Sequence, residues 1–413
     1  MSVIDLSAYG ADFTANPYPY YAALRASGPV HEILTPEGVP AWLIVGHEEA
    51  RAALVDPRLV KDVTAVTGFV PLEFEVIGRN LLGVDPPDHT RLRKLVAGEF
   101  TVRRVEALRP RVQELTDELL DAMAAGKAGE PGNSGQSGEP GRTAGAGRAD
   151  LVDAFAFPLP ITVICELLGV PTADRDTFRA WSNEAVAPTG ALSEREVFDG
   201  FGGYLDALIE DKRAAGPQDD LLSALIATRA EDGDRLALSE LRALAFLLLV
   251  AGHETTVNLI ATTVRLLLGH PEQLAALRAD FGLLDQVIEE SLRYDGPVET
   301  ATYRFAAEDV DLAGTAVPAG SVVLVGLAAA GHDPARFADP ERFDTRRDPR
   351  GHLAFGHGIH YCLGAPLARL EAKVAIRSLL ERFPRLALDP ATEPYTWLPG
   401  ILIRGTRELP VVW

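Results

Sequence analysis

The chain has 413 residues, of which 47% are hydrophobic and 7% are aromatic. This length and composition suffice to bury a large core, and we expect one globular domain over residues 1–413. Asp and Glu outnumber Lys and Arg by 59 to 39, which gives a formal net charge of -20. Such an acidic surface excludes nucleic acid as an expected partner and keeps the protein soluble.

The N-terminal stretch and the most apolar stretch both bear on location. The opening residues, MSVIDLSAYGADF, have neither a basic start nor an apolar run, so we expect a cytoplasmic protein without a secretory signal. The apolar stretch LRALAFLLLVAG, at 241–252, meets His253 and Glu254 well before about 18 apolar residues have passed. It therefore predicts a buried helix and no membrane span.

The spacing of apolar residues and of chain breakers predicts the elements in chain order. AWLIV at 41–45 and SVVLVGL at 321–327 are bounded by Gly or Pro and predict short strands. Ser193 and Glu196 have the spacing of a capping box within a mostly helical stretch, 151–290. Many helices and few strands that do not alternate predict a mainly α, α+β fold. Steps of three and four predict one amphipathic helix face at Val105, Leu108, Val112, Leu115 and Leu119.

The stretch from Gly126 to Asp150 differs from its surroundings. It reads GKAGEPGNSGQSGEPGRTAGAGRAD and is rich in Gly, Pro and Ser, so it can bury almost no apolar surface. Helical sequence resumes directly afterwards. We therefore expect a surface loop at 126–150 within the domain.

Cys362 lies directly before a helical stretch, in FGHGIHYCLGAPLARLE at 355–371. The free N–H groups and the dipole of a helix start favour a thiolate or a metal-bound sulfur there. The alternatives are a structural cysteine and a zinc ligand beside His357 and His360. Zinc is disfavoured because the other cysteine, Cys165, lies in the apolar ITVICELLGV and is expected in the core.

Phe355, Gly358, His360, Cys362 and Gly364 fit the pattern F-x-x-G-x-[HR]-x-C-x-G, and the stretch thereby resembles the haem-binding loop of cytochrome P450 enzymes. The resemblance implies the cytochrome P450 fold, a helix-rich triangular prism with a small β-rich region. It also implies haem b as cofactor, with Cys362 as the axial ligand of its iron. Phe355, Gly356 and Gly364 would contact the porphyrin.

AGHETT, from Ala251 to Thr256, resembles the oxygen-activation segment of the same family. The resemblance makes Thr255 the alcohol and Glu254 the acid that deliver protons to reduced O2, with Ala251 beside the haem. Adjacent helix residues do not share a face, so we expect Thr255 to face the haem and Glu254 to act through water or a rotamer change. Gly252 is expected to widen the turn beside O2. His253 is expected to be a packing or surface residue.

Two further matches concern stability and the haem carboxylates. Glu290 and Arg293 of EESLRY are spaced for an ion pair, and the resemblance joins them to Arg342 of DPERFD in a structural network. DPPDHTRLRKLV at 85–96 and YRF at 303–305 resemble the segments that bind the haem propionates. The propionate partners thus implied, which must be cationic or hydrogen-bonding, are His89, Arg93, Arg304 and His360.

The resemblance implies a monooxygenase that uses O2. No flavin or ferredoxin module fits in the chain, so electrons are expected from NAD(P)H through a ferredoxin reductase and a ferredoxin. The basic residues Lys94, Arg103, Arg104 and Arg109 are expected to dock that ferredoxin, and the enzyme is expected to be a monomer. A haem-thiolate ligand sensor and a peroxide-driven peroxygenase are the alternatives. Glu254 and Thr255 argue against both, because neither has a need for such a proton route.

Over most of its length the chain resembles actinobacterial macrolide hydroxylases of the pikromycin type and, more distantly, a vitamin D hydroxylase. A macrolide or related polyketide is therefore the expected substrate, and a steroid, vitamin D-like or other terpenoid is the alternative. Those macrolide hydroxylases hold an amino sugar with acidic residues just ahead of D-P-P, where this chain has Gly83 and Val84. Glu73 and Glu75 are the candidate anchors instead. The resemblance implies a mostly apolar lining: Phe69, Val70, Leu72, Leu81, Leu82, Leu247, Val250, Ala251, Val298, Thr302, Ile401 and Leu402.

Overall fold

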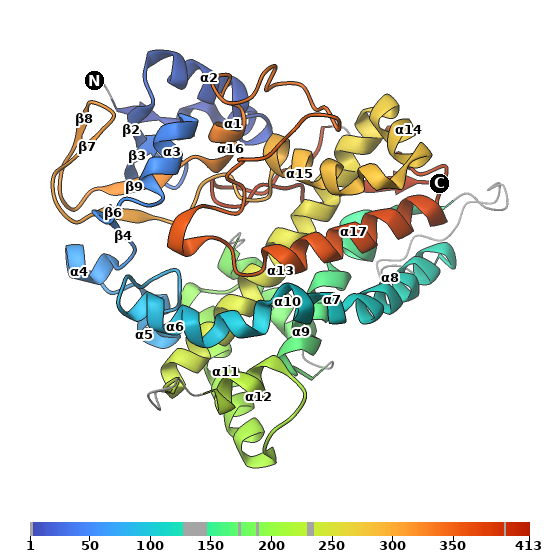
Figure 1. Cartoon of the computed structure of the whole chain (residues 1–413), viewed down its shortest axis with the longest axis horizontal. Coiled ribbons are helices and arrows are strands. Elements are labelled where there is room, and N and C mark those ends of the chain that lie inside the picture. The colour runs from blue at the N-terminus through green and yellow to red at the C-terminus, as the bar shows by residue number, and fades with distance from the viewer. Residues whose placement is uncertain (1–2, 127–146, 172–174, 187–189, 229–234, 392–393) are drawn as a thin grey trace.

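A computed structural model of the chain describes residues 3–126, 147–171, 175–186, 190–228, 235–391 and 394–413. Helices dominate these ranges, and the strands gather largely at one side of the molecule (Figure 1). The prediction of a mainly α, α+β fold is confirmed.

The largest sheet joins strands from distant parts of the chain, in the order β1-β2-β3-β9-β6-β4. β3 pairs antiparallel with β2 and parallel with β9. The predicted strands at 41–45 and 321–327 correspond to β3 and β9. The strands of this sheet are β1 (Ile4–Asp5), β2 (Val30–Leu34), β3 (Pro40–Ile44), β4 (Leu59–Val60), β6 (Arg304–Ala306) and β9 (Val322–Val325). The smaller sheets are β10 (Ala387–Leu388), β11 (Pro410–Val412) and β5 (Arg148–Asp150), and β7 (Val310–Leu312) with β8 (Thr315–Val317).

The end of the predicted loop at 126–150 is a strand instead. β5 pairs antiparallel with β11, and the N–H of Gly147 donates to the carbonyl of Trp413. A Cβ at Gly147 would overlap the Trp413 ring, so this glycine serves a close contact that composition could not reveal. Residues 127–146 of the predicted loop lie outside the described residues.

α13 (Leu238–Gly269) runs through the centre of the molecule (Figure 1). It contacts α9 (Pro158–Leu168), α11 (Glu194–Ala215), α15 (Leu284–Asp295) and α17 (Ala365–Arg382). By length and composition α13 could cross a membrane, but 61% of its most apolar stretch is buried inside the fold. α13 is thus the core helix that the apolar run at 241–252 predicts.

Two local predictions have different outcomes. The capping box is confirmed, because Ser193 Oγ accepts from the N–H of Glu196 and the Glu196 carboxylate accepts from the N–H of Ser193. The helix predicted over 105–119 is divided into α7 (Val102–Ala107) and α8 (Arg109–Ala124). Pro110 lies in the first turn of α8. A backbone N–H there would have no acceptor within the helix, so proline costs no hydrogen bond.

Shorter helices complete the fold on either side of α13. Those near the large sheet are α1 (Gly10–Ala15), α2 (Tyr18–Ser27), α3 (His47–Ala53), α4 (Val63–Thr67) and α16 (Leu327–Gly331). The others are α5 (Leu72–Val76), α6 (Asp88–Ala97), α10 (Arg175–Val186), α12 (Leu221–Ala227) and α14 (Pro271–Ala279).

Candidate active site

Cys362 lies in the loop that leads into α17. Its backbone N–H donates to the carbonyl of Phe355 at 2.9 Å, which closes the loop. Gly356 and Gly358 have φ angles of 72° and 74°, which other residues rarely adopt. A Cβ at Gly358 would also come within 2.6 Å of the Val55 side chain. The loop therefore needs glycine at these positions for its own conformation.

Cys362 is exposed, although protein surrounds most of its thiol. Burial raises the pKa of Cys362 above its ordinary value, although backbone N–H groups of Gly364 and Ala365 bond to the sulfur and act in the opposite direction. The start of α17 alone therefore does not make Cys362 a thiolate, contrary to the expectation from the helix dipole. A thiol in this setting loses its proton when its sulfur binds a metal ion.

Phe355 is supported by residues that the sequence analysis did not single out. The Arg369 guanidinium lies over the Phe355 ring, 4.4 Å from its centroid. Arg369 Nε in turn donates to Glu289 at 2.5 Å, and His352 Nε2 lies 3.0 Å from the same carboxylate. Burial raises the pKa of Glu289, but the hydrogen bonds from Arg369 and His352 outweigh it and lower the pKa to about 2.

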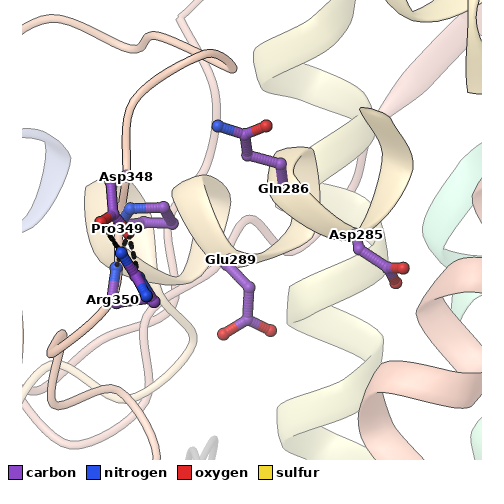
Figure 2. A pocket seen from close by; sticks show the side chains of 6 residues that line it. All are labelled: Asp285, Gln286, Glu289, Asp348, Pro349 and Arg350. Carbon is purple, nitrogen blue, oxygen red and sulfur yellow. Dashed lines mark hydrogen bonds and ion pairs between the residues drawn. The ribbon is translucent and has the colours of Figure 1, made fainter. Parts of the chain in front are cut away.

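Glu289 also borders a surface cavity of about 440 Å³ (Figure 2). The Asp348–Arg350 ion pair lies on one side of this cavity. None of the predicted site residues lines it. The lining consists of Asp285, Gln286, Glu289, Asp348, Pro349 and Arg350.

One stripe of α13 is not covered by protein, although the helix crosses the centre of the fold. Leu247 and Thr255 are half-buried and Ala251 is exposed, whereas most neighbouring positions are buried. Residues four apart share a helix face, so these side chains form one surface. It is apolar except for Thr255, whose Oγ1 donates to the Ala251 carbonyl at 2.9 Å. Thr255 is therefore the one polar group on this apolar surface.

The neighbours of Thr255 face elsewhere. Glu254 and His253 are buried, so His253 is a packing residue and not a surface one. Gly252 lies in continuous α-helix, and a Cβ there would come within 3.2 Å of Ile164 on α9. Gly252 thus allows close packing against α9, and the turn is not widened as expected.

Several buried nitrogen atoms without partners lie near the Cys362 loop. The rings of His89 and His360 are 4.2 Å apart, and none of their nitrogens has a hydrogen-bond partner in the described part of the chain. Arg304 donates through its terminal nitrogens to the carbonyls of Leu59 and Leu54, but its buried Nε is unpartnered. Burial and the neighbouring cationic groups lower the pKa of His360 to about 3, so this ring is neutral.

Two more basic residues, Arg93 and Lys61, lie near His360. Arg93 donates to the carbonyl of Tyr361, next to Cys362. Lys61 is buried, and its Nζ donates to the Thr302 carbonyl at 2.8 Å and to Thr302 Oγ1 at 2.5 Å. Burial lowers the pKa of Lys61 well below its ordinary value. Lys61 was missed because a single lysine in a strand-like stretch carries no sequence signal.

The predicted ion network is present with a different third arginine. Glu290 and Arg293 are fully buried and joined by paired hydrogen bonds of 2.8 Å. Arg347 Nε lies 3.2 Å from Glu290, whereas the Arg342 side chain is exposed. Arg342 contributes only its carbonyl, which accepts from Arg293 and Arg347. Because the Arg342 side chain is exposed and only its carbonyl enters the network, the expectation for it is not met.

Most of the predicted lining residues are accessible in the structure, but Leu81 and Ile401 are not. Leu81 belongs to the main core, and Ile401 packs with the N-terminal helices and the large sheet. The accessible ones are Phe69, Val70, Leu72, Leu82, Leu247, Val250, Ala251, Val298, Thr302 and Leu402.

The candidate anchors for an amino group differ in their surroundings. Glu73 of α5 is half-buried and accepts from Asn80 at 2.9 Å, and burial raises the pKa of Glu73. Glu75 is exposed, and its carboxylate lies 3.9 Å from Arg195. A Cβ at Gly83 would overlap the Phe74 ring, so a side chain at this position requires that ring to move.

The basic residues predicted to dock a ferredoxin are partly neutralised by acidic neighbours. Arg104 is paired with Glu99, and Arg109 Nε lies 2.9 Å from Glu106. Lys94 and Arg103 are exposed, and no ion pair involves either of them within the ranges that the structure describes. These two residues therefore carry the available positive charge.

A family comparison bears directly on this arrangement: residues 191–406 match the profile described as "Cytochrome P450". The chain belongs to the cytochrome P450 family. It is 56% identical over 411 residues to "Cytochrome P450 monooxygenase PikC" of Streptomyces venezuelae, covering 100% of this chain and 94% of the relative. This P450 is also 45% identical to "6-deoxyerythronolide B hydroxylase" of Saccharopolyspora erythraea, covering 97% and 96%. It is thus a P450 monooxygenase closely related to macrolide hydroxylases.

Solved structures agree with the fold of this P450. The ligand-free P450 monooxygenase TamI superposes with a TM-score of 0.84 at 43% identity, covering 99% of this chain and 94% of that chain. The family implies a haem, and the residues fit one. The orphaned nitrogens of His89, His360 and Arg304 would be satisfied by carboxylate groups, and Cys362 offers a sulfur to iron.

Proposed function

We propose that this P450 hydroxylates or epoxidises a bulky, lipophilic polyketide, most simply a macrolide. The observation that carries the proposal is the apolar stripe of α13 at Leu247 and Ala251, with Thr255 as its polar group. When bound, the haem activates O2 and transfers one oxygen atom to carbon. The apolar stripe and the accessible lining residues would hold the substrate and exclude water.

The chain's own residues supply attachment and protons in this proposal. Cys362 would bind the iron, and His89, His360 and Arg304 would hold the carboxylates. Thr255 would turn its hydroxyl from the Ala251 carbonyl toward the reacting oxygen and donate a proton, which Glu254 replaces. The main core, which joins residues from Ile77 to Val411, supports the further proposal of one domain over 1–413. The protein is also proposed to be monomeric and cytoplasmic.

Electrons are proposed to come from NAD(P)H through a reductase and a ferredoxin that binds near Lys94 and Arg103. Because Arg104 and Arg109 are already paired, reversing the charge of Arg103 should slow reduction more than reversing that of Arg104. Stopped-flow reduction at two salt concentrations measures both variants. Equal rates in the two variants and the parent would exclude this docking surface.

The test of the proposed function is a carbon monoxide difference spectrum of the reduced protein, followed by titration with macrolides, steroids and vitamin D. A spectrum typical of thiolate-bound haem and a spin shift with a macrolide are expected. A haem-loaded protein without that spectrum would contradict the role of Cys362. A spin shift with steroids alone would favour the terpenoid alternative, and binding without product formation in the presence of O2 and electrons would favour a sensor.

Glu73 is the candidate contact for an amino sugar. Glu73→Gln should weaken binding of an amino-sugar macrolide by about tenfold, the effect of losing one partly buried ion pair, and leave the sugar-free macrolactone unaffected. Spectral titration measures both affinities. Equal affinities of the variant and the parent for the amino-sugar compound would exclude Glu73 as its anchor.

A further inference from the structure

His253 contacts the proposed acid of the site, although the proposed function assigns it no part. It is buried between α13 and α10, and its exposed fraction is 1%. Nδ1 lies 2.6 Å from the carbonyl oxygen of Leu249. Nε2 lies 3.1 Å from Ser182 Oγ on α10 and 3.2 Å from Glu254 Oε1.

The Leu249 carbonyl determines where the ring carries its proton. A carbonyl oxygen can only accept a hydrogen bond, so Nδ1 of His253 is protonated. In the neutral ring, Nε2 is then an acceptor and receives the hydroxyl proton of Ser182. An ionised Glu254 would bring a second acceptor to 3.2 Å from that nitrogen with no proton between them. One further proton, on the Glu254 carboxyl or on Nε2, would join the two groups by a hydrogen bond.

The surroundings of the pair leave no other partner for that proton. Glu254 is buried, and among the described residues its Oε1 has no hydrogen bond of good geometry, no Lys or Arg within 4.0 Å, and His253 Nε2, at 3.2 Å, as its close polar neighbour. The other contacts of His253 within the described ranges are uncharged, and its ring is perpendicular to the Phe157 ring, with 5.6 Å between centroids.

Titratable groups of the neighbouring helices are engaged elsewhere. Glu184 of α10 accepts from the N–H of Gly190 at 3.1 Å. Glu166 of α9 is paired with Arg111 on the protein surface, at 2.9 Å. Within the described ranges, the His253–Glu254 contact is therefore a local pair.

We propose that His253 and Glu254 hold one proton in common, that Ser182 orients the ring, and that this pair is the proton reserve of the active site. The inference rests on the proposed function and extends the proton route by two residues. A proton leaves the Glu254 carboxyl through one solvent water to Thr255 Oγ1, and the hydroxyl proton of Thr255 passes to the reacting oxygen. Ser182 then passes its hydroxyl proton to Nε2 of His253 and regains a proton from solvent, and Nε2 passes its new proton to the Glu254 carboxylate. His253 and Ser182 thus act as positioning residues behind Glu254.

His253→Gln tests the inference, because glutamine can replace the hydrogen bonds but does not titrate near neutral pH. The haem-loaded variant should form about tenfold less product per NAD(P)H and release more hydrogen peroxide, with substrate affinity within about twofold of the parent. The coupling ratio of the variant should depend less on pH than that of the parent. Ser182→Ala should show a smaller loss and a larger solvent isotope effect on product formation.

His270→Gln is the matched control. His270 follows the far end of α13 and contacts the carbonyl one helix turn before it, as His253 does. Its Nδ1 lies 2.7 Å from the Leu266 carbonyl oxygen. This variant should couple like the parent. Parent-like coupling and pH dependence in His253→Gln, with uncoupling in Glu254→Gln, would overturn the inference and leave the proposed function intact.

The remaining outcomes are also decisive. If Glu254→Gln and Thr255→Val couple normally as well, the acid–alcohol route of the proposed function itself is wrong. If His253→Gln does not fold, Ser182→Ala decides, and an unchanged coupling ratio and isotope effect in it would overturn the inference.

Discussion

Glu289 stabilises the loop that carries Cys362 through two neighbouring side chains. It binds Arg369, whose guanidinium covers the Phe355 ring, and it also contacts His352. The folded pKa of Glu289, about 2, lies below the value of about 4.3 for an unperturbed glutamate. The ionised carboxylate therefore stabilises the folded state above about pH 4.3, and this contribution is lost as the pH falls toward the folded pKa.

Glu289→Gln should accordingly lower the free energy of unfolding near neutral pH. After allowance for the partial exposure of the side chain, the expected loss is about 2 kcal/mol, and the difference from the parent should disappear as the pH falls toward about 2. Urea unfolding at a series of pH values measures it. Glu381→Gln, which breaks an exposed pair with Arg377, is the control and should cost less than about 0.5 kcal/mol. A difference that is independent of pH would contradict this assignment.

At the scale of elements, the network of Glu290 and Arg293 connects α15 to the segment that precedes the cysteine loop. Arg293 donates to the carbonyls of Gly331, Pro340 and Arg342, and Arg347 approaches Glu290 from the same segment. Because Glu290 is fully buried, removal of either Arg293 or Arg347 leaves the negative charge of Glu290 less compensated.

Arg347→Ala should therefore destabilise the protein by about 3 kcal/mol and lower its haem content, whereas Arg342→Ala should remain close to the parent. The haem-to-protein ratio and thermal unfolding of the two variants give the comparison. The opposite order would show that the side chain of Arg342 enters the network in solution.

At the scale of the whole molecule, Arg404 connects the two ends of the chain. It is buried, binds Asp295 at the end of α15, and donates to the carbonyls of Thr14 and Ala15. Asp295 also accepts from Tyr18 and Arg265. The N-terminal helices, α15 and the C-terminal segment are thus joined by one buried cluster of charges.

Arg404→Met should leave Asp295 with one cationic partner and cost about 3 to 5 kcal/mol of unfolding free energy. Arg407→Ala is the control, because its side chain is exposed. Limited proteolysis should cut the N-terminal helices faster in Arg404→Met than in the control. Equal stability of the two variants would show that the cluster does not hold the ends together.

The sequence by itself determined the family and the core helix and predicted the cysteine loop and the acid–alcohol pair, because these depend on residue types at short spacings along one element. Only the tertiary structure decided that Arg347 replaces Arg342, that Lys61 and Arg369 support the site, and that Leu81 and Ile401 are buried. It also placed Ser182 and His253 beside Glu254 and showed that burial raises the pKa of Cys362. These properties depend on which way a carbonyl or side chain faces and on contacts between residues far apart in sequence, which local spacing does not specify.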